Sequence, residues 1–105
     1  ISLTIDQAIP CGLIINELLT NIMKYAFPEG FSGEKTISIS FHESIECRPV
    51  LTVKDTGAGI PETIDFETNE SLGLTLVRML TMQLQGNIVL NRGKGTEFII
   101  SFIRK

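Results

Sequence analysis

The sequence has little of what metal-binding, disulfide-rich and membrane proteins need. It contains only two cysteines and one histidine in 105 residues. Cys11 and Cys47 do not stand at a metal-ligand spacing, so we expect two unpaired thiols in a reducing compartment. No apolar run approaches the roughly 20 residues that a membrane-spanning helix needs, and no signal peptide is visible. We therefore expect a cytoplasmic location and no direct membrane contact by this domain.

An excess of basic residues is also missing. Lys and Arg number nine against twelve Asp and Glu, which gives a net charge of -3. Nucleic acids and anionic membranes are bound non-specifically through clustered Lys and Arg, so we expect no nucleic-acid partner. The length fits one small domain over residues 1–105. Because the sequence begins with Ile1 and not with Met, we expect a fragment of a longer protein.

The hydrophobic pattern predicts two helices. The first is expected over residues 6–26, capped by Asp6 and with Pro10 near its first turn, where a missing N–H is tolerated. The second is expected over residues 72–85, and Gly86 is placed to terminate it.

Alternation of apolar and polar residues predicts four strands, of which the last two form a hairpin. The order is helix, two strands, long loop, helix, two strands, which favours a helical layer on one face of a mainly antiparallel or mixed sheet. The expected strands are at residues 37–42, 49–55, 87–91 and 96–103. The other face of the sheet can meet solvent or a partner, and it carries Ser38, Ser40, His42, Thr52 and Lys54.

Three polar residues share one side of the first predicted helix. Glu17, Asn21 and Lys24 stand at i, i+4 and i+7, which places them within roughly 60° of each other around the axis. A carboxylate can act as a general base, an amide oxygen suits Mg²⁺, and an ammonium can bind phosphate. A solvated polar face on an amphipathic helix explains the same pattern.

A second candidate site follows the second strand. Asp55 shares a face with Leu51 and Val53, so its carboxylate is expected on the core side, where it needs a hydrogen-bond partner. An exocyclic amine such as that of adenine would serve. Gly57 and Gly59 allow the backbone to approach a ligand closely. The alternative is an ordinary glycine-containing turn at the end of a strand.

Two further segments are weaker signals. Gly73 stands where the second helix starts, and backbone N–H groups there favour a bound anion such as phosphate. Thr96 places a hydroxyl at the start of the last strand. Loop punctuation and a plain hairpin turn explain these two features equally well. The polar loop over residues 55–71 is long, and such loops in compact domains are usually functional or disordered.

Taken together and in this order, the four segments resemble the ATP-binding domain of sensor histidine kinases, in the superfamily shared with DNA gyrase, the heat-shock chaperone ATPases and the mismatch-repair ATPases. The resemblance implies an α/β (α+β) two-layer sandwich, the Bergerat fold, with a mixed, mainly antiparallel sheet and helices on one face. Residues 17–28 are similar to the short-lid HisKA_2/HWE-like subgroup, and the lid is expected at about residues 62–72.

The resemblance also implies chemistry. It implies that the chain binds ATP with Mg²⁺ and donates the γ-phosphoryl group to a histidine on a preceding dimerisation domain, with a response regulator downstream. Glu17 is then the catalytic base, and Asn21 is the Mg²⁺ ligand. The residues that it assigns to the nucleotide are Asn21, Lys24, Tyr25, Asp55, Gly57, Gly59, Ile60, Leu72, Gly73, Leu74 and Thr96.

Two other functions remain open at this point. One is a serine kinase of the anti-sigma-factor type, which resembles the same fold but more often carries His where this chain has Lys24 and Tyr25. The other is a non-catalytic, nucleotide-dependent interaction module. Because Glu17 and Asn21 are both present, nothing in the sequence forces that choice. The chain itself offers no phosphoacceptor, because its one histidine, His42, is expected on the surface of a strand.

Overall fold

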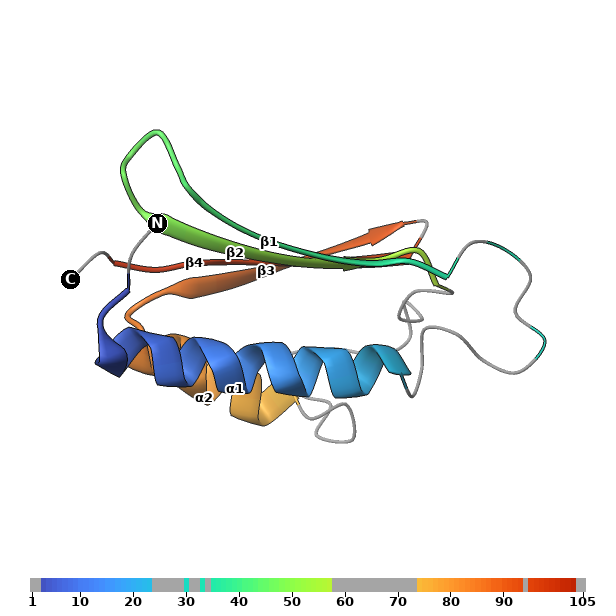
Figure 1. Ribbon diagram of the computed structural model, residues 1–105, viewed down its shortest axis with the longest axis horizontal. Coiled ribbons are helices and arrows are strands. Elements are labelled where there is room, and N and C mark those ends of the chain that lie inside the picture. Colours follow the sequence, from blue (N-terminus) through green and yellow to red (C-terminus); the bar gives the residue numbers. More distant parts are fainter. Residues whose placement is uncertain are drawn as a thin grey trace.

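The computed structural model describes residues 3–23, 30, 33, 35–57, 74–93 and 95–103. Both helices lie over the same face of a four-stranded sheet, so the molecule has two layers (Figure 1). The predicted two-layer α+β architecture is thus confirmed. In chain order the elements are α1 (Ile5–Asn21), β1 (Ile37–Glu43), β2 (Pro49–Asp55), α2 (Leu74–Gln83), β3 (Asn87–Gly93) and β4 (Gly95–Ser101).

The strand order across the sheet is β1-β2-β4-β3, and each of the three pairings is antiparallel. The prediction allowed a mixed sheet, but the part of the chain that the structure describes contributes antiparallel pairs alone. β1–β2 and β3–β4 are hairpins, whose short connections force antiparallel pairing. β2 and β4 lie side by side in the middle of the sheet, so the central strands come from different halves of the chain.

The strand bounds agree closely with the predicted ones. β2 spans residues 49–55 as predicted, and β1 extends one residue further, to Glu43. The second hairpin is tighter than expected, because Arg92 pairs with Thr96 and Gly93 pairs with Gly95. The two strands therefore continue almost to the turn, where the sequence had indicated a four-residue connection.

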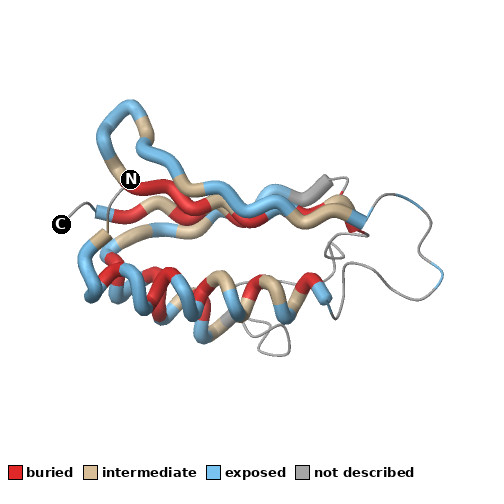
Figure 2. Tube along the Cα trace, viewed as in Figure 1, coloured by how far each residue is buried: buried red, intermediate tan, exposed pale blue. Residues whose placement is uncertain are grey.

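One apolar core lies between the two layers, and Figure 2 shows the buried residues on the facing sides of the helices and the central strands. The side chains of Ile14, Leu18, Leu51 and Val53 are fully buried. Burying such side chains is the main favourable term in folding, at about 1.5–3 kcal/mol each. The rest of the core cluster consists of Cys11, Ile22, Val77, Leu80, Leu84, Phe98, Ile100 and Phe102.

The start of α1 differs from the prediction. The helix begins at Ile5, and the capping position belongs to Thr4, whose backbone is extended (φ -73°, ψ 163°), and not to Asp6. The backbone N–H of Thr4 donates to Oε1 of Gln7 at 3.4 Å. The same Gln7 side chain is buried and donates from Nε2 to the Ile103 carbonyl at 2.8 Å. Gln7 therefore ties the first turn of α1 to the end of the chain beyond β4.

Pro10 also occupies a different place from the one predicted. It stands inside α1, five residues after the first helical residue, so the Asp6 carbonyl has no N–H to accept at the usual i+4 position. At its other end α1 stops at Asn21, and Ile22 and Met23 continue as a π-helical turn. The predicted continuation to residue 26 lies outside the described residues.

The end of α2 shows what Gly86 does. Gly86 was predicted to terminate the helix, but the residue with positive φ after the helix is Gln85 (φ 55°). The N–H of Gln85 donates to the Met82 carbonyl at 2.9 Å, and the N–H of Gly86 donates to the Thr81 carbonyl at 3.1 Å, which is a Schellman ending. Glycine is required at residue 86 for a different reason: a Cβ there would overlap the Ser101 carbonyl oxygen of β4.

Within the described ranges, neither α1 nor α2 has the combination of length and apolar character needed to cross a membrane. The predicted second helix covered residues 72–85, whereas α2 spans Leu74–Gln83, and the two residues before it are not described.

Two glycines give a matched test of this packing. In the Gly86→Ala variant the new Cβ would also lie 2.8 Å from the Phe102 Cβ, so the backbone must move. We expect a loss of about 1–3 kcal/mol in unfolding free energy, as for other overpacked sites. Gly12→Ala is the control, because Gly12 is an exposed residue of α1 and nothing lies within 4 Å of a Cβ added there. That change should stabilise by up to about 1 kcal/mol. Urea unfolding of both variants measures the difference, and similar effects of the two changes would contradict this account.

Candidate functional site

Three predicted site segments meet at one end of the sandwich. β2 ends there at Asp55, β4 begins there at Gly95, and the last turns of α1 lie beneath the same end (Figure 1). This arrangement follows from the topology, because β2 and β4 are antiparallel neighbours and Asp55 pairs directly with Thr96. Asp55 and Thr96 are 41 positions apart in the sequence, and only the strand pairing brings them together.

Asp55 is the central group of this site. Its side chain is 2% exposed, as its position on the Leu51 and Val53 face predicted. One carboxylate oxygen, Oδ1, accepts the Gly57 N–H at 2.8 Å, and the Thr96 backbone N–H also donates to the carboxylate. Burial raises the pKa of Asp55 above its usual value of 3.8, and the two backbone donors offset part of that rise. A buried carboxylate of this kind still has lone pairs available for a ligand donor.

The neighbouring backbone is packed tightly around Asp55. Gly57 is buried, and Thr96 is 5% exposed. Gly95 has a φ of 92°, and a Cβ at that residue would overlap the Asp55 carbonyl oxygen. Any side chain at residue 95 would push β4 away from the end of β2. Glycine there therefore permits the close approach that places the Thr96 N–H on the carboxylate.

A pair of threonines also contributes to this end of the sheet, and the sequence analysis did not identify it. The Thr56 N–H donates to the Thr36 carbonyl at 3.1 Å. In return, the Thr36 N–H donates to the Thr56 hydroxyl oxygen at 2.9 Å. The sequence alone could not predict this pair, because the register that sets Thr36 opposite Thr56 depends on the length of the β1–β2 turn.

The polar side of α1 lies under the same end. Glu17 and Asn21 are both partly buried, which places them at the border between the core and solvent. Nδ2 of Asn21 is buried and has no hydrogen-bond partner among the described residues. Because the two ends of an amide are nearly the same shape, this position suits either a donor or, with the amide turned over, the oxygen ligand of a cation. A buried polar atom without a partner among the described residues is uncommon and calls for an explanation, and a bound ion is one of them.

The described residues do not form a dedicated metal cage. Among residues 3–23, 35–57, 74–93 and 95–103, no group of three or more His, Cys, Asp or Glu side chains is arranged to hold an ion. Mg²⁺ commonly binds through one or two protein oxygens together with substrate phosphates and water. The Asn21 amide fits that mode of binding, and it would provide a single protein ligand for Mg²⁺.

Several predicted site residues lie outside the described part of the chain. They are Lys24, Tyr25, Gly59, Ile60, Leu72 and Gly73, together with the whole of the expected lid. Leu74 opens α2, but its side chain is not described. Their predicted contacts with a nucleotide therefore remain predictions.

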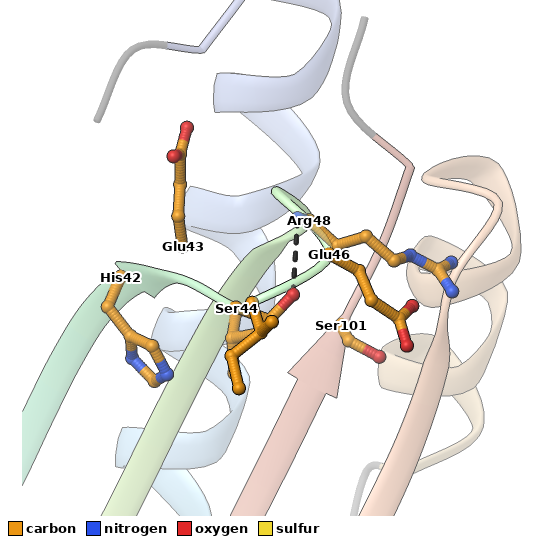
Figure 3. A pocket seen from close by; sticks show the side chains of 8 residues that line it. His42, Glu43, Ser44, Glu46, Arg48 and Ser101 are labelled. Atoms are coloured by element: carbon orange, nitrogen blue, oxygen red, sulfur yellow. Dashed lines mark hydrogen bonds between the residues drawn. The ribbon is translucent and has the colours of Figure 1, made fainter.

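The turn between β1 and β2 lies at the opposite end of the sheet (Figure 1), and a separate open pocket lies around it (Figure 3). There the Arg48 N–H donates to the Ser44 hydroxyl at 3.2 Å, and Nε of Arg48 donates to the Phe102 carbonyl at 3.4 Å. His42 is exposed on this side, as predicted. None of the predicted site residues lines it; the lining residues are His42, Glu43, Ser44, Ile45, Glu46, Arg48, Val50 and Ser101.

Neither cysteine is a predicted site residue, and neither lines the pocket. Both thiols are free, as predicted, with Cys11 in the core and Cys47 exposed in the β1–β2 turn. Burial raises the pKa of the Cys11 thiol to about 11, so it stays protonated and unreactive at neutral pH.

The raised pKa of Asp55 has a consequence for stability. The folded protein takes up a proton on Asp55 at a higher pH than the unfolded chain does. At a pH where Asp55 is charged in both states, burial of that charge therefore opposes folding. Relative to an Asp55→Asn variant, the wild type should therefore gain stability as the pH falls from neutrality towards 3.8, the usual pKa of the group. Urea unfolding of both proteins at several pH values measures this difference. A wild type that loses stability relative to the variant on acidification would show that the pKa is lowered instead.

Comparison with known proteins shows the family to which this chain is similar. Residues 6–105 match the model of the histidine kinase-, DNA gyrase B- and HSP90-like ATPases. The chain is 33% identical over 101 residues to blue-light-activated histidine kinase 2 of Erythrobacter litoralis, which covers 96% of this chain and 28% of that protein. It is 31% identical over 98 residues to the sensor histidine kinase PdtaS of Mycobacterium tuberculosis, covering 90% of this chain and 19% of that one. The chain thus spans less than a third of these relatives.

Solved structures agree with the sequence relatives. The blue-light activated histidine kinase EL346 of Erythrobacter litoralis superposes with a TM-score of 0.85 at 29% identity, over 95% of this chain and 31% of that one. The Acinetobacter baumannii histidine kinase AdeS has the same fold, with a TM-score of 0.69 at 23% identity, over 91% of this chain and 46% of that one. The chain belongs to the family of histidine kinase-, DNA gyrase B- and HSP90-like ATPases.

Proposed function

We propose that this chain binds Mg·ATP at the end of the sheet marked by Asp55 and donates the γ-phosphoryl group to a histidine on a dimerisation domain of the same protein. The observation that carries the proposal is the buried Asp55 carboxylate, held by the Gly57 and Thr96 backbone at the end of the sheet that lies over the last turns of α1 (Figure 1). A carboxylate that accepts two backbone N–H groups still has lone pairs for a further donor, and the exocyclic amine of adenine is a donor of suitable size.

The phosphate end of the nucleotide would lie toward α1. Phosphoryl transfer requires mainly positioning of the phosphates and neutralisation of their charge, with little covalent chemistry by the protein. The Asn21 amide, whose buried nitrogen has no partner in the part of the chain that the structure describes, would hold the Mg²⁺ that the nucleotide brings. Glu17 stands one turn earlier on α1 and would act as the base that polarises the attacking group. Lys24, Tyr25 and the backbone at Gly73 would contact the nucleotide phosphates.

Histidine is the proposed acceptor because two relatives, which match 96% and 90% of this chain, are named histidine kinases. A response regulator would then receive the phosphoryl group from that histidine. The test is a transfer assay with labelled ATP, using the longer protein that joins this chain to its dimerisation domain. Acid-labile, base-stable labelling of a histidine supports the proposal. Labelling of a serine on a partner protein would favour the anti-sigma-type kinase, and binding without any labelling would favour the non-catalytic module.

The adenine contact predicts nucleotide selectivity. Guanine carries a carbonyl oxygen where adenine carries its amine, so GTP would set two acceptors against each other at Asp55. We expect ATP to bind at least about tenfold more tightly than GTP, which corresponds to about 1.4 kcal/mol. Calorimetric titration of the chain with each nucleotide in the presence of Mg²⁺ measures the ratio. Equal affinities would remove the argument for adenine at Asp55.

The two α1 residues should separate binding from chemistry. Asn21→Ala removes the proposed Mg²⁺ ligand, so we expect ATP affinity to fall about tenfold or more with Mg²⁺ and to change little when EDTA is present. Glu17→Gln keeps the size of the side chain but removes the base, so binding should stay within about twofold while transfer falls by about 10²-fold or more. If Glu17→Gln abolished binding and left the transfer rate of the bound protein normal, the two roles would be wrongly assigned.

A further inference from the structure

The pairing of β1 with β2 continues past the ends of both strands in an unusual way. Ile37 pairs with Asp55, so Thr36 and Thr56 are the next residues in register. An ordinary antiparallel pair exchanges two backbone hydrogen bonds. Here the first one is present, from the Thr56 N–H to the Thr36 carbonyl. The Thr36 N–H, however, donates to the Thr56 hydroxyl at 2.9 Å, so a side chain takes the place usually held by the Thr56 carbonyl.

This exchange lies at the point where the chain leaves the sheet. The Asp55 carboxylate accepts the N–H of Gly57, two residues further on, which is an Asx-turn. The backbone therefore turns directly after Asp55, while the Thr56 hydroxyl keeps the turn attached to β1. The same hydroxyl also lies 3.5 Å from the Thr36 carbonyl oxygen, to which it can donate.

β4 holds the opposite side of the same peptide. A Cβ on Gly95 would overlap the Asp55 carbonyl oxygen and lie 3.1 Å from the Thr56 Cα. The peptide between Asp55 and Thr56 is thus confined by Thr36 of one neighbour and by Gly95 of the other. With both sides confined, the direction of the Asp55 carboxylate depends on where Thr56 is held.

We propose that Thr56 is a positioning residue for the nucleotide: its hydroxyl fixes the Asp55–Gly57 turn to the start of β1 and so sets the carboxylate for the adenine amine. The inference rests on the proposed function, because it assumes that Asp55 receives the nucleotide. Thr56 does not itself touch the reacting phosphate in this account. Its loss therefore weakens ATP binding and leaves the transfer chemistry of the bound complex unchanged.

The side-chain requirement is specific. Serine retains a hydroxyl that can accept the Thr36 N–H, whereas valine has the shape of threonine but puts a methyl group there. We expect Thr56→Val to weaken ATP binding by about fivefold or more, the effect of losing roughly one hydrogen bond, and Thr56→Ser to stay within about twofold. In the phosphotransfer assay, Thr56→Val should raise KM for ATP and leave kcat within about twofold.

Thr52→Val is the matched control. Thr52 lies within β2, four residues before Thr56, where it pairs with Ser40 and Ile99 in the middle of the sheet. The same loss of a hydroxyl there should leave ATP affinity unchanged. An equal loss of affinity in both variants would mean that any change on this strand disturbs the site, and would overturn the proposal.

A double-mutant cycle with Asp55→Asn separates this inference from the proposed function. If Asp55→Asn weakens ATP binding and Thr56→Val adds little to it, the two residues act together as proposed. If Asp55→Asn leaves ATP affinity unchanged, the proposed nucleotide site itself is wrong. If Asp55→Asn weakens binding but Thr56→Val alone does not, the site stands and the positioning role of Thr56 fails.

Amide hydrogen exchange reports the structural step directly. In Thr56→Val the Thr36 amide loses its acceptor and should exchange faster, while amides in the middle of β2 keep their protection. Unchanged exchange at Thr36 would contradict the proposal. Thr56→Ala serves as a second variant that adds no bulk. If both Thr56→Val and Thr56→Ala failed to fold, the hydroxyl would be required for the fold as a whole, which also overturns a specific positioning role.

Discussion

The buried carboxylate of Asp55 is the constraint on which this end of the molecule depends. Removing a carboxylate from water is unfavourable unless donors surround it. The donors here are backbone N–H groups of Gly57 and Thr96, one from the next turn and one from the neighbouring strand. Supplying both requires the chain to turn immediately after β2 and β4 to approach closely. Gly95 meets the second requirement, because it has no side chain to hold the strands apart.

The rest of the fold can be understood as a rigid support for that end. A single core joins α1, α2, β2 and β4, and its central side chains, such as Leu18 and Val53, are fully buried. β2 and β4 lie in the middle of the sheet, so Asp55 and Thr96 are held by neighbours on both sides. The candidate site is built from the ends of these elements. Chemistry at such ends can differ between proteins of one family without changing the core that supports them.

The two ends of the sheet also differ in character. At one end lie the buried Asp55 and the partly buried Glu17 and Asn21, with a buried amide nitrogen that has no partner among the residues described. At the other end the β1–β2 turn forms an exposed pocket whose Arg48 already uses its Nε to bind the Phe102 carbonyl. A buried polar atom without a described partner calls for an explanation, which an open depression on the surface does not. This contrast is the reason for proposing function at the Asp55 end.

The sequence by itself determined the elements and the face on which Asp55 lies. The position of Asp55 on the same face as Leu51 and Val53 was enough to predict the burial of its carboxylate, because side chains on a strand point alternately to the two faces. Periodicity likewise predicted both helices. These features are local, so each can be derived from neighbouring residues alone.

Only the tertiary structure decided how the ends of the elements are held. Thr4 rather than Asp6 caps α1, with Gln7 bound to Ile103, and Gly86 is required by contact with β4 rather than by its own backbone angles. The Thr36–Thr56 pair and the pairing of Asp55 with Thr96 also join residues 20 and 41 positions apart. Contacts of this kind depend on strand register and on turn geometry, which a local pattern does not contain. The sequence could therefore name the carboxylate, but the fold was needed to show what holds it in place.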